Sequence, residues 1–128
     1  MAQIATTIEQ SKKLIKLGIN VNTADMTYNA IVVSGEDKML INGWKLKVGL
    51  DSEIKDNDFS YRNGYTIPAW SLSALLDILP FPQLSKDKLG GGKVGWMVSV
   101  YPNDCRYDSC WHDNPIDACY EMIIKLRN

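Results

Sequence analysis

The sequence predicts an α+β fold, in which one antiparallel sheet of about five to six strands, joined as hairpins, carries three helices on one face. Three observations lead to this expectation. Three segments combine a helical spacing of apolar residues with helix start or stop signals. Several other segments alternate apolar and polar residues as strands do, and Asn-Gly or Gly-rich turns separate these predicted strands. We therefore expect a helix, several strands, a helix, a hairpin and a last helix.

The first and last helices carry the clearest end signals. Thr6 or Thr7 can cap the first helix, and Thr7 with Gln10 has the spacing of a capping box. Gly18 then ends this helix, because glycine accepts the left-handed conformation of a C-terminal cap. Asn114 is placed to cap the last helix, whose predicted buried stripe consists of Ile116, Cys119, Tyr120 and Ile123.

A middle helix is predicted to begin at Pro68, since proline suits the first helical position. Pro80 and Pro82 are expected to end it, because proline removes a backbone donor from the helix. The buried stripe of this helix is predicted to be formed by Leu72, Leu75, Leu76 and Leu79.

The strands of the first half are predicted from β-branched runs and Asn-Gly pairs. Ala30–Ser34 and Met39–Ile41 are two expected strands, and Asn42-Gly43 is expected to form a type I′ hairpin turn into the alternating segment Trp44–Leu50. A second pair, Asn63-Gly64, is predicted to form another hairpin. The sequence therefore predicts antiparallel pairing throughout this half.

In the second half, Val94–Tyr101 is the strongest predicted strand, and Arg106–His112 is its expected hairpin partner. The segment Ser85–Lys93, rich in lysine and glycine, is interpreted as a loop.

Composition limits the kinds of function. The 128 residues suit a single domain, 1–128, and 14 Lys and Arg against 15 Asp and Glu leave no basic excess for gripping nucleic acid. No apolar run is long enough to span a membrane. Three cysteines, an odd number, argue against a disulfide framework, so the cytoplasm is the expected location.

A thiol-based active site is one alternative. Cys110 and His112 are two residues apart and would share a face of a strand, and Asp108 or Asp113 could orient the imidazole. This would give a small hydrolase or transferase. Most nucleophile–base pairs come from different elements, however, so a surface or packing role for His112 is favoured.

A structural zinc site is a second alternative. Cys105, Cys110, His112 and Cys119 are suitable zinc ligands by type, but their spacing departs from the paired cysteines of structural sites. Cys119 also falls on the predicted buried stripe of the last helix. The favoured expectation is therefore a chain without a metal.

The glycines Gly90, Gly92 and Gly95 match the spacing G-x-G-x-x-G. A dinucleotide-binding site needs a strand before this motif and a helix after it, whereas a strand is predicted to follow here. A hairpin turn or loop is the favoured interpretation, and no cofactor is expected.

The absence of a convergent catalytic set favours a protein that acts by binding another protein. The candidate surface is the aromatic hairpin with the glycine loop before it, because exposed aromatic residues commonly anchor interfaces. A homodimer formed by an exposed edge strand is kept as an alternative. The candidate binding residues are Trp96, Trp111, Gly90, Gly91 and Gly92.

Five short segments, mostly helix starts, resemble a group of small uncharacterised proteins from phages and mobile elements of gut bacteria. The resemblance implies an accessory protein in the cytoplasm of a bacterial host, and it implies no catalytic residue. The segments are Thr7–Ser11, Leu17–Ile19, Asn22–Met26, Ile67–Leu72 with Leu75 and Leu76, and Asn114–Ala118.

Overall fold

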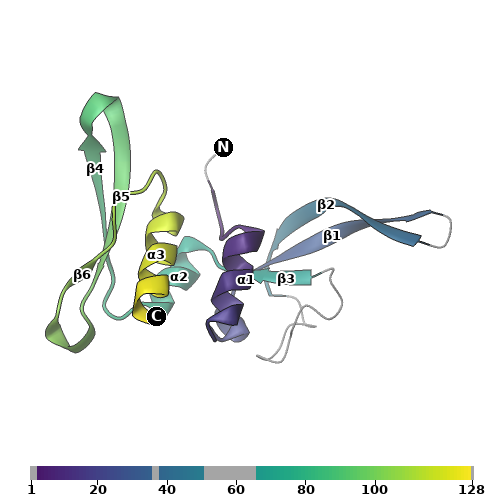
Figure 1. Cartoon of the computed structure of the whole chain (residues 1–128), viewed down its shortest axis with the longest axis horizontal. Coiled ribbons are helices and arrows are strands. Elements are labelled where there is room, and N and C mark those ends of the chain that lie inside the picture. Colours follow the sequence, from purple (N-terminus) through teal and green to yellow (C-terminus); the bar gives the residue numbers. More distant parts are fainter. Residues whose placement is uncertain (1–2, 36–37, 51–65, 128) are drawn as a thin grey trace. The chain divides into compact units, whose positions relative to one another are not determined.

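The computed structural model describes residues 3–35, 38–50 and 66–127. These residues form three α-helices and six strands in two separate three-stranded antiparallel sheets (Figure 1). The α+β class and the antiparallel pairing are thus confirmed, whereas the expectation of a single sheet is wrong. The chain divides into two compact units, Thr7–Trp70 and Ser71–Asn128 with Met1–Thr6, so each sheet belongs to its own unit. The expectation of one domain stays a prediction.

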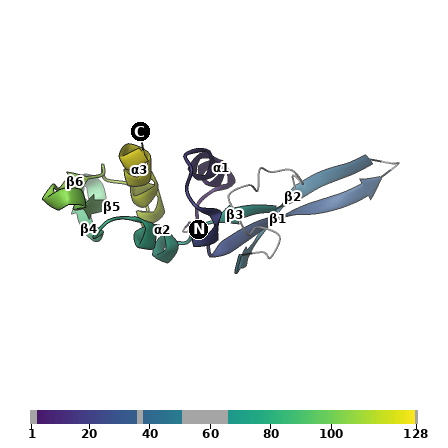
Figure 2. The ribbon, with the colours of Figure 1, turned by 90° about the horizontal axis from the view of Figure 1, so that it is seen from below.

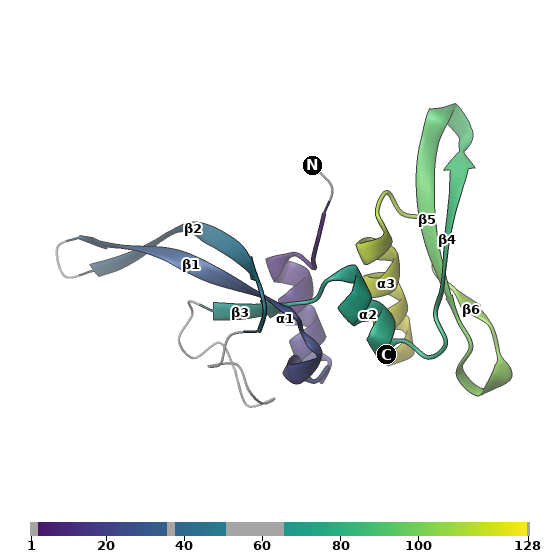
Figure 3. The ribbon, with the colours of Figure 1, turned by 180° about the vertical axis from the view of Figure 1, so that it is seen from behind.

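The unit Thr7–Trp70 contains one helix and one sheet. The sheet has the strand order β2-β1-β3, and within the described part of the chain β3 pairs with Met26–Asn29, the first part of β1. The rest of β1 pairs with β2 alone among the described residues, as a long two-stranded ribbon (Figure 3). The elements are α1 (Ile8–Lys16), the 3₁₀ turn η1 (Val21–Thr23), β1 (Met26–Gly35), β2 (Lys38–Val48) and β3 (Thr66–Ala69).

Both ends of α1 form as the sequence predicts. Thr7 Oγ1 accepts from the Gln10 backbone N–H at 3.1 Å, and Gln10 Oε1 accepts from the Thr7 N–H at 3.0 Å, which completes the capping box. At the other end Gly18 has φ +89°, and the Gly18 and Ile19 N–H groups bond the Ile15 and Leu14 carbonyls. This is a Schellman motif, and it turns Ile19 into the core.

Trp70 is the largest buried side chain of this unit. Its Nε1 donates to Thr23 Oγ1 at 2.9 Å, so the polar edge of the indole is satisfied where water is excluded. The other fully buried side chains of helix, turn and strand in this unit include Leu14, Ile19, Val21 and Ile67.

Two predictions in this unit are wrong. Asn42 and Gly43 do not form a hairpin turn but lie inside β2, where they stand opposite the single residue Ile31 as a β-bulge. Gly43 has φ +104°, so the positive φ serves the bulge. Pro68 starts no helix and lies in β3, an edge strand of the described sheet, where its missing N–H is tolerated. The predicted hairpin at Asn63-Gly64 lies outside the described residues.

The second unit holds the other sheet and two helices. Its strand order is β4-β5-β6, and α3 packs on β5 and on α2 (Figure 2). Helix α2 begins after Ser71, whose Oγ accepts from the Ala74 N–H at 3.3 Å, and not at Pro68. The elements are α2 (Leu72–Ile78), β4 (Gln83–Leu89), η2 (Gly90–Gly92), β5 (Lys93–Val100), η3 (Pro102–Asp104), β6 (Tyr107–Asp108) and α3 (Pro115–Arg127).

The segment interpreted as a loop, Ser85–Lys93, is mostly strand β4 and the turn η2. Its polar residues mislead because β4 is an edge strand with little burial. β5 is confirmed, but its main hairpin partner is β4. The predicted partner Arg106–His112 contributes the short strand β6 and one further bridge, between His112 and Trp96.

The last helix is confirmed in detail. Asn114 Oδ1 accepts from the Asp117 backbone N–H at 2.9 Å and so caps α3. Tyr120 is half-buried and the other three residues of the predicted stripe are buried. Together with β5 and α2 this stripe forms the core of the unit, which includes Leu75, Val98, Val100, Ile116, Cys119, Met122 and Ile123.

Candidate functional site

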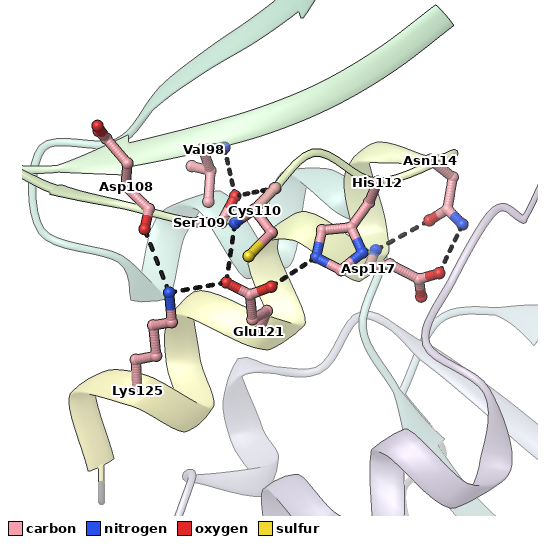
Figure 4. Close-up of polar contacts among 9 residues, drawn as sticks. All are labelled: Val98, Asp108, Ser109, Cys110, His112, Asn114, Asp117, Glu121 and Lys125. Carbon is pink, nitrogen blue, oxygen red and sulfur yellow. Dashed lines mark hydrogen bonds and ion pairs between the residues drawn. The ribbon is translucent and has the colours of Figure 1, made fainter. Parts of the chain in front are cut away.

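The carboxylate of Glu121 has three partners on the face of α3 beside the segment that follows β6 (Figure 4). Glu121 Oε2 accepts from the Cys110 backbone N–H and from Lys125 Nζ, both at 3.0 Å. Glu121 Oε1 lies 2.7 Å from His112 Nε2. One side chain of the helix thus holds two positions of the segment Ser109–His112.

The electrostatics of Glu121 follow from these contacts. Partial burial raises the pKa of its carboxyl group, but hydrogen bonds from Cys110, His112 and Lys125 lower it further, and the pKa falls to about 2. The hydrogen bond to Glu121 in turn raises the pKa of Lys125. Glu121 is therefore ionised at neutral pH, and its side chain is 23% exposed.

In the predicted thiol site, the imidazole of His112 contacts Glu121. Within the described residues no hydrogen bond joins Cys110 Sγ to His112, and His112 Nε2 is engaged by Glu121 instead. In Figure 4 the sulfur of Cys110 lies on the Glu121 side of the imidazole ring. The orienting group of His112 is thus Glu121, whereas the sequence suggested Asp108 or Asp113.

Asp108 has other partners. Its Oδ1 accepts from Ser99 Oγ at 2.6 Å and pairs with Arg106 Nε at 2.8 Å, and these hydrogen bonds lower the pKa of the Asp108 carboxyl group. Asp113 is exposed. The hydrolase or transferase alternative stays a prediction, but these contacts give it no nucleophile–base pair.

The four candidate zinc ligands have different surroundings. Cys119 is fully buried on α3, and burial raises the pKa of its thiol to about 12, so it carries no thiolate at neutral pH. Cys105 and Cys110 are both exposed. Across the described ranges no three His, Cys, Asp or Glu side chains come together in a way that could hold a metal ion.

Trp111 lies on Gly95 of β5. A Cβ atom added to Gly95 would stand 2.6 Å from Leu89 Cδ1 and 3.2 Å from Trp111 Cε3, so both side chains cover this glycine. Met97 shares the face, because alternate residues of a strand point the same way. We call Leu89, Gly95, Met97 and Trp111 the Trp111 surface, and Trp111 itself is 40% exposed.

Trp96 belongs to the opposite face of the sheet. It pairs directly with His112, and directly paired residues point the same way, whereas Trp111 is the neighbour of His112 and points the other way. Trp96 is half-buried, and Lys86 Nζ lies 4.9 Å from the centre of its ring. The two predicted binding tryptophans therefore do not form one patch.

The glycines Gly90, Gly91 and Gly92 form the turn between β4 and β5. Gly91 and Gly92 have φ of +80° and +78°, conformations that glycine adopts without strain. Because a strand and not a helix follows, the turn lacks the helix N-terminus of a dinucleotide site. The hairpin interpretation of this segment is confirmed.

Two residues were not predicted from the sequence: Glu121 as the centre of the polar cluster and Leu89 as a neighbour of Trp111. The ion pair of Glu121 with Lys125, at 3.0 Å, joins residues four apart on one helix, a spacing that the sequence shows. The contacts of Glu121 with Cys110 and His112 depend on how the chain turns into α3, and no local spacing signals them.

No helix in the described residues is long and apolar enough to cross a membrane. Comparison with protein-family models, with curated proteins and with solved structures finds no match to this chain.

Proposed function

We propose that this chain is an accessory protein that acts by binding another protein through the Trp111 surface. The observation that carries the proposal is the placement of Trp111, which is 40% exposed yet supported by Gly95 and Leu89. An indole fixed in this way offers a large apolar area and loses little side-chain entropy on binding, as anchor residues of interfaces do.

The surroundings of this surface indicate the chemistry of the partner. On the face of the sheet that carries Trp111, the exposed charged residues of the β4–β5 hairpin are Asp87 and Lys93, whereas Lys86 and Lys88 lie on the Trp96 face. These two charges are of opposite sign, so the partner is expected to contact the Trp111 surface chiefly through apolar side chains. Binding should therefore change little as salt screens charges.

The sequence resemblance to small proteins of phages and mobile elements supports the same role. Within this proposal the chain works in the cytoplasm of a bacterial host, and its partner is a protein of that host or of the element that encodes it.

The test compares two aromatic truncations in the same unit. The purified chain and its Trp111→Ala variant are used as baits in a bacterial lysate, and the affinity of each captured protein is then measured. Trp111→Ala is expected to weaken the specific partner at least tenfold, because truncating an interface anchor costs about 2 kcal/mol or more. Tyr107→Ala, which truncates an exposed aromatic of β6, is the matched control and should bind normally. Unchanged binding by Trp111→Ala would refute the proposed surface.

A further inference from the structure

The segment after β6 changes its register against β5 before it reaches α3. Ser99 pairs with Asp108, and Trp96 pairs with His112. Between these pairings β5 has two residues, whereas the facing segment has three, Ser109–Trp111. The extra residue makes a β-bulge, and a bulge changes the direction in which the following side chains point.

The register change decides where Trp111 points. If the register of β6 continued without a bulge, Trp111 would stand opposite Trp96 and share its face. That face packs on α3, as the contact of His112 with Glu121 shows. With the bulge, His112 takes the position opposite Trp96, and Trp111 turns to the other face, over Gly95.

The backbone N–H and carbonyl of Cys110 both form hydrogen bonds with side chains instead of with the backbone of β5. The Val98 N–H donates to Ser109 Oγ at 3.0 Å, and Ser109 Oγ donates to the Cys110 carbonyl at 2.9 Å. The Ser109 hydroxyl thus accepts the hydrogen bond that a backbone carbonyl would accept in a regular antiparallel pair. On the other side, the Cys110 N–H donates to Glu121 Oε2 at 3.0 Å (Figure 4).

We infer that Ser109 and Glu121 are positioning residues that hold the bulge and thereby present Trp111 for binding. The inference rests on the proposed function for its biological meaning, but the placement of Trp111 can be measured without any partner. Glu121 also contacts His112 and so stabilises the same segment at a second position. Ser109 is buried within the sheet. Neither residue belongs to the Trp111 surface.

The experiment labels the full chain with 5-fluorotryptophan and follows the ¹⁹F resonances, each assigned by a Trp→Phe variant. Glu121→Ala is expected to shift the Trp111 resonance and leave that of Trp70 in place. It should also speed hydrogen exchange at the Cys110 amide about tenfold or more, as expected for the loss of a hydrogen bond to a charged acceptor. Glu121→Gln, which keeps an acceptor, should restore both readouts.

Lys125→Ala is the comparison variant: it removes a neighbour of Glu121 and its 3.3 Å hydrogen bond to the Asp108 carbonyl, but leaves the Cys110 and His112 contacts in place, so a smaller shift of the Trp111 resonance is expected. Ser109→Ala against Ser109→Thr tests the other side of the bulge through the Val98 amide and the Trp111 resonance. An unchanged Trp111 resonance in both alanine variants, or a shift shared equally with Trp70, would overturn the inference.

The two proposals fail in different ways. If Trp111→Ala abolishes partner binding but Glu121→Ala leaves both the Trp111 resonance and the affinity unchanged, the surface is right and the positioning role is wrong. If Glu121→Ala moves Trp111 but Trp111→Ala binds every partner normally, the positioning stands and the proposed surface is wrong.

Discussion

The two sheets each contain a bulge beside a tryptophan, and the two bulges are held in different ways. In β2, Asn42 and Gly43 stand opposite Ile31, and Gly43 takes φ +104°. Beside β5, Ser109 and Cys110 form the irregularity, and side-chain hydrogen bonds from Ser109 and Glu121 satisfy the displaced backbone. The first bulge depends on the backbone freedom of one residue, the second on groups from two elements.

The difference shows how far in the sequence the determinants of a local irregularity can lie. The bulge in β2 contains a glycine with positive φ, so we expect substitutions of that glycine to disturb it. The bulge beside β5 depends on a carboxylate of α3, so it responds to changes of charge and to substitutions in another element.

The largest expected effect comes from replacing the Ser109 hydroxyl. Ser109→Val fills the same space but leaves the buried Val98 N–H without its acceptor, which should lower the free energy of unfolding of this unit by about 2–3 kcal/mol. Denaturant unfolding followed by circular dichroism measures it. Ser109→Thr keeps the hydroxyl and should lose less than about 1 kcal/mol. Equal stability of the two variants would show that the hydroxyl does not hold the bulge.

The second prediction concerns the stability of the fold at acidic pH. The pKa of Glu121 in the folded chain is about 2, below its ordinary value of 4.5, so its contribution to stability is complete above pH 4.5 and is lost as the pH falls through 2. Because the side chain is partly exposed, the loss should be about 1–2 kcal/mol. It is measured as the difference in unfolding free energy between the wild type and Glu121→Gln across this range. A difference independent of pH would contradict the prediction.

The smallest effect is expected at the glycine of the other bulge. Nothing lies within 4 Å of a Cβ added to Gly43, so Gly43→Ala should cost only the strain of its positive φ, about 1 kcal/mol. Hydrogen exchange of the β1 and β2 amides would detect the loosened ribbon. Gly90→Ala is the matched control, because Gly90 also has open space around its added Cβ and no positive φ. If both variants exchange alike, the conformation of Gly43 does not limit the stability of the ribbon.

Features set by neighbouring residues were predictable from the sequence. The capping box of Thr7 and Gln10, the C-terminal cap at Gly18 and the cap of α3 at Asn114 all involve groups within a few residues of one another. The ion pair of Glu121 with Lys125 belongs to the same class, since one helical turn fixes its geometry.

Features set by distant partners were not predictable. A positive φ at Gly43 suits a hairpin turn and a bulge equally, and only the facing strand decides between them. Pro68 suits a helix start or an edge strand, and β1 decides. The charged sequence of β4 looks like a loop because a strand at the edge of a sheet needs no alternation. The chain forms two sheets instead of one because the pairing of its strands depends on partners that lie far apart in the sequence.

The arrangement around Cys110 also has a genetic consequence. Ser109 and Glu121 bond opposite sides of one residue, the carbonyl and the N–H of Cys110, and no hydrogen bond between their own side chains exists in the described part of the chain. A mutation at either position changes what the other contributes, so we expect epistasis between them. Both of these hydrogen bonds use the backbone of Cys110, so we expect a proline at position 110, which has no N–H, to disturb the bulge more than other substitutions there.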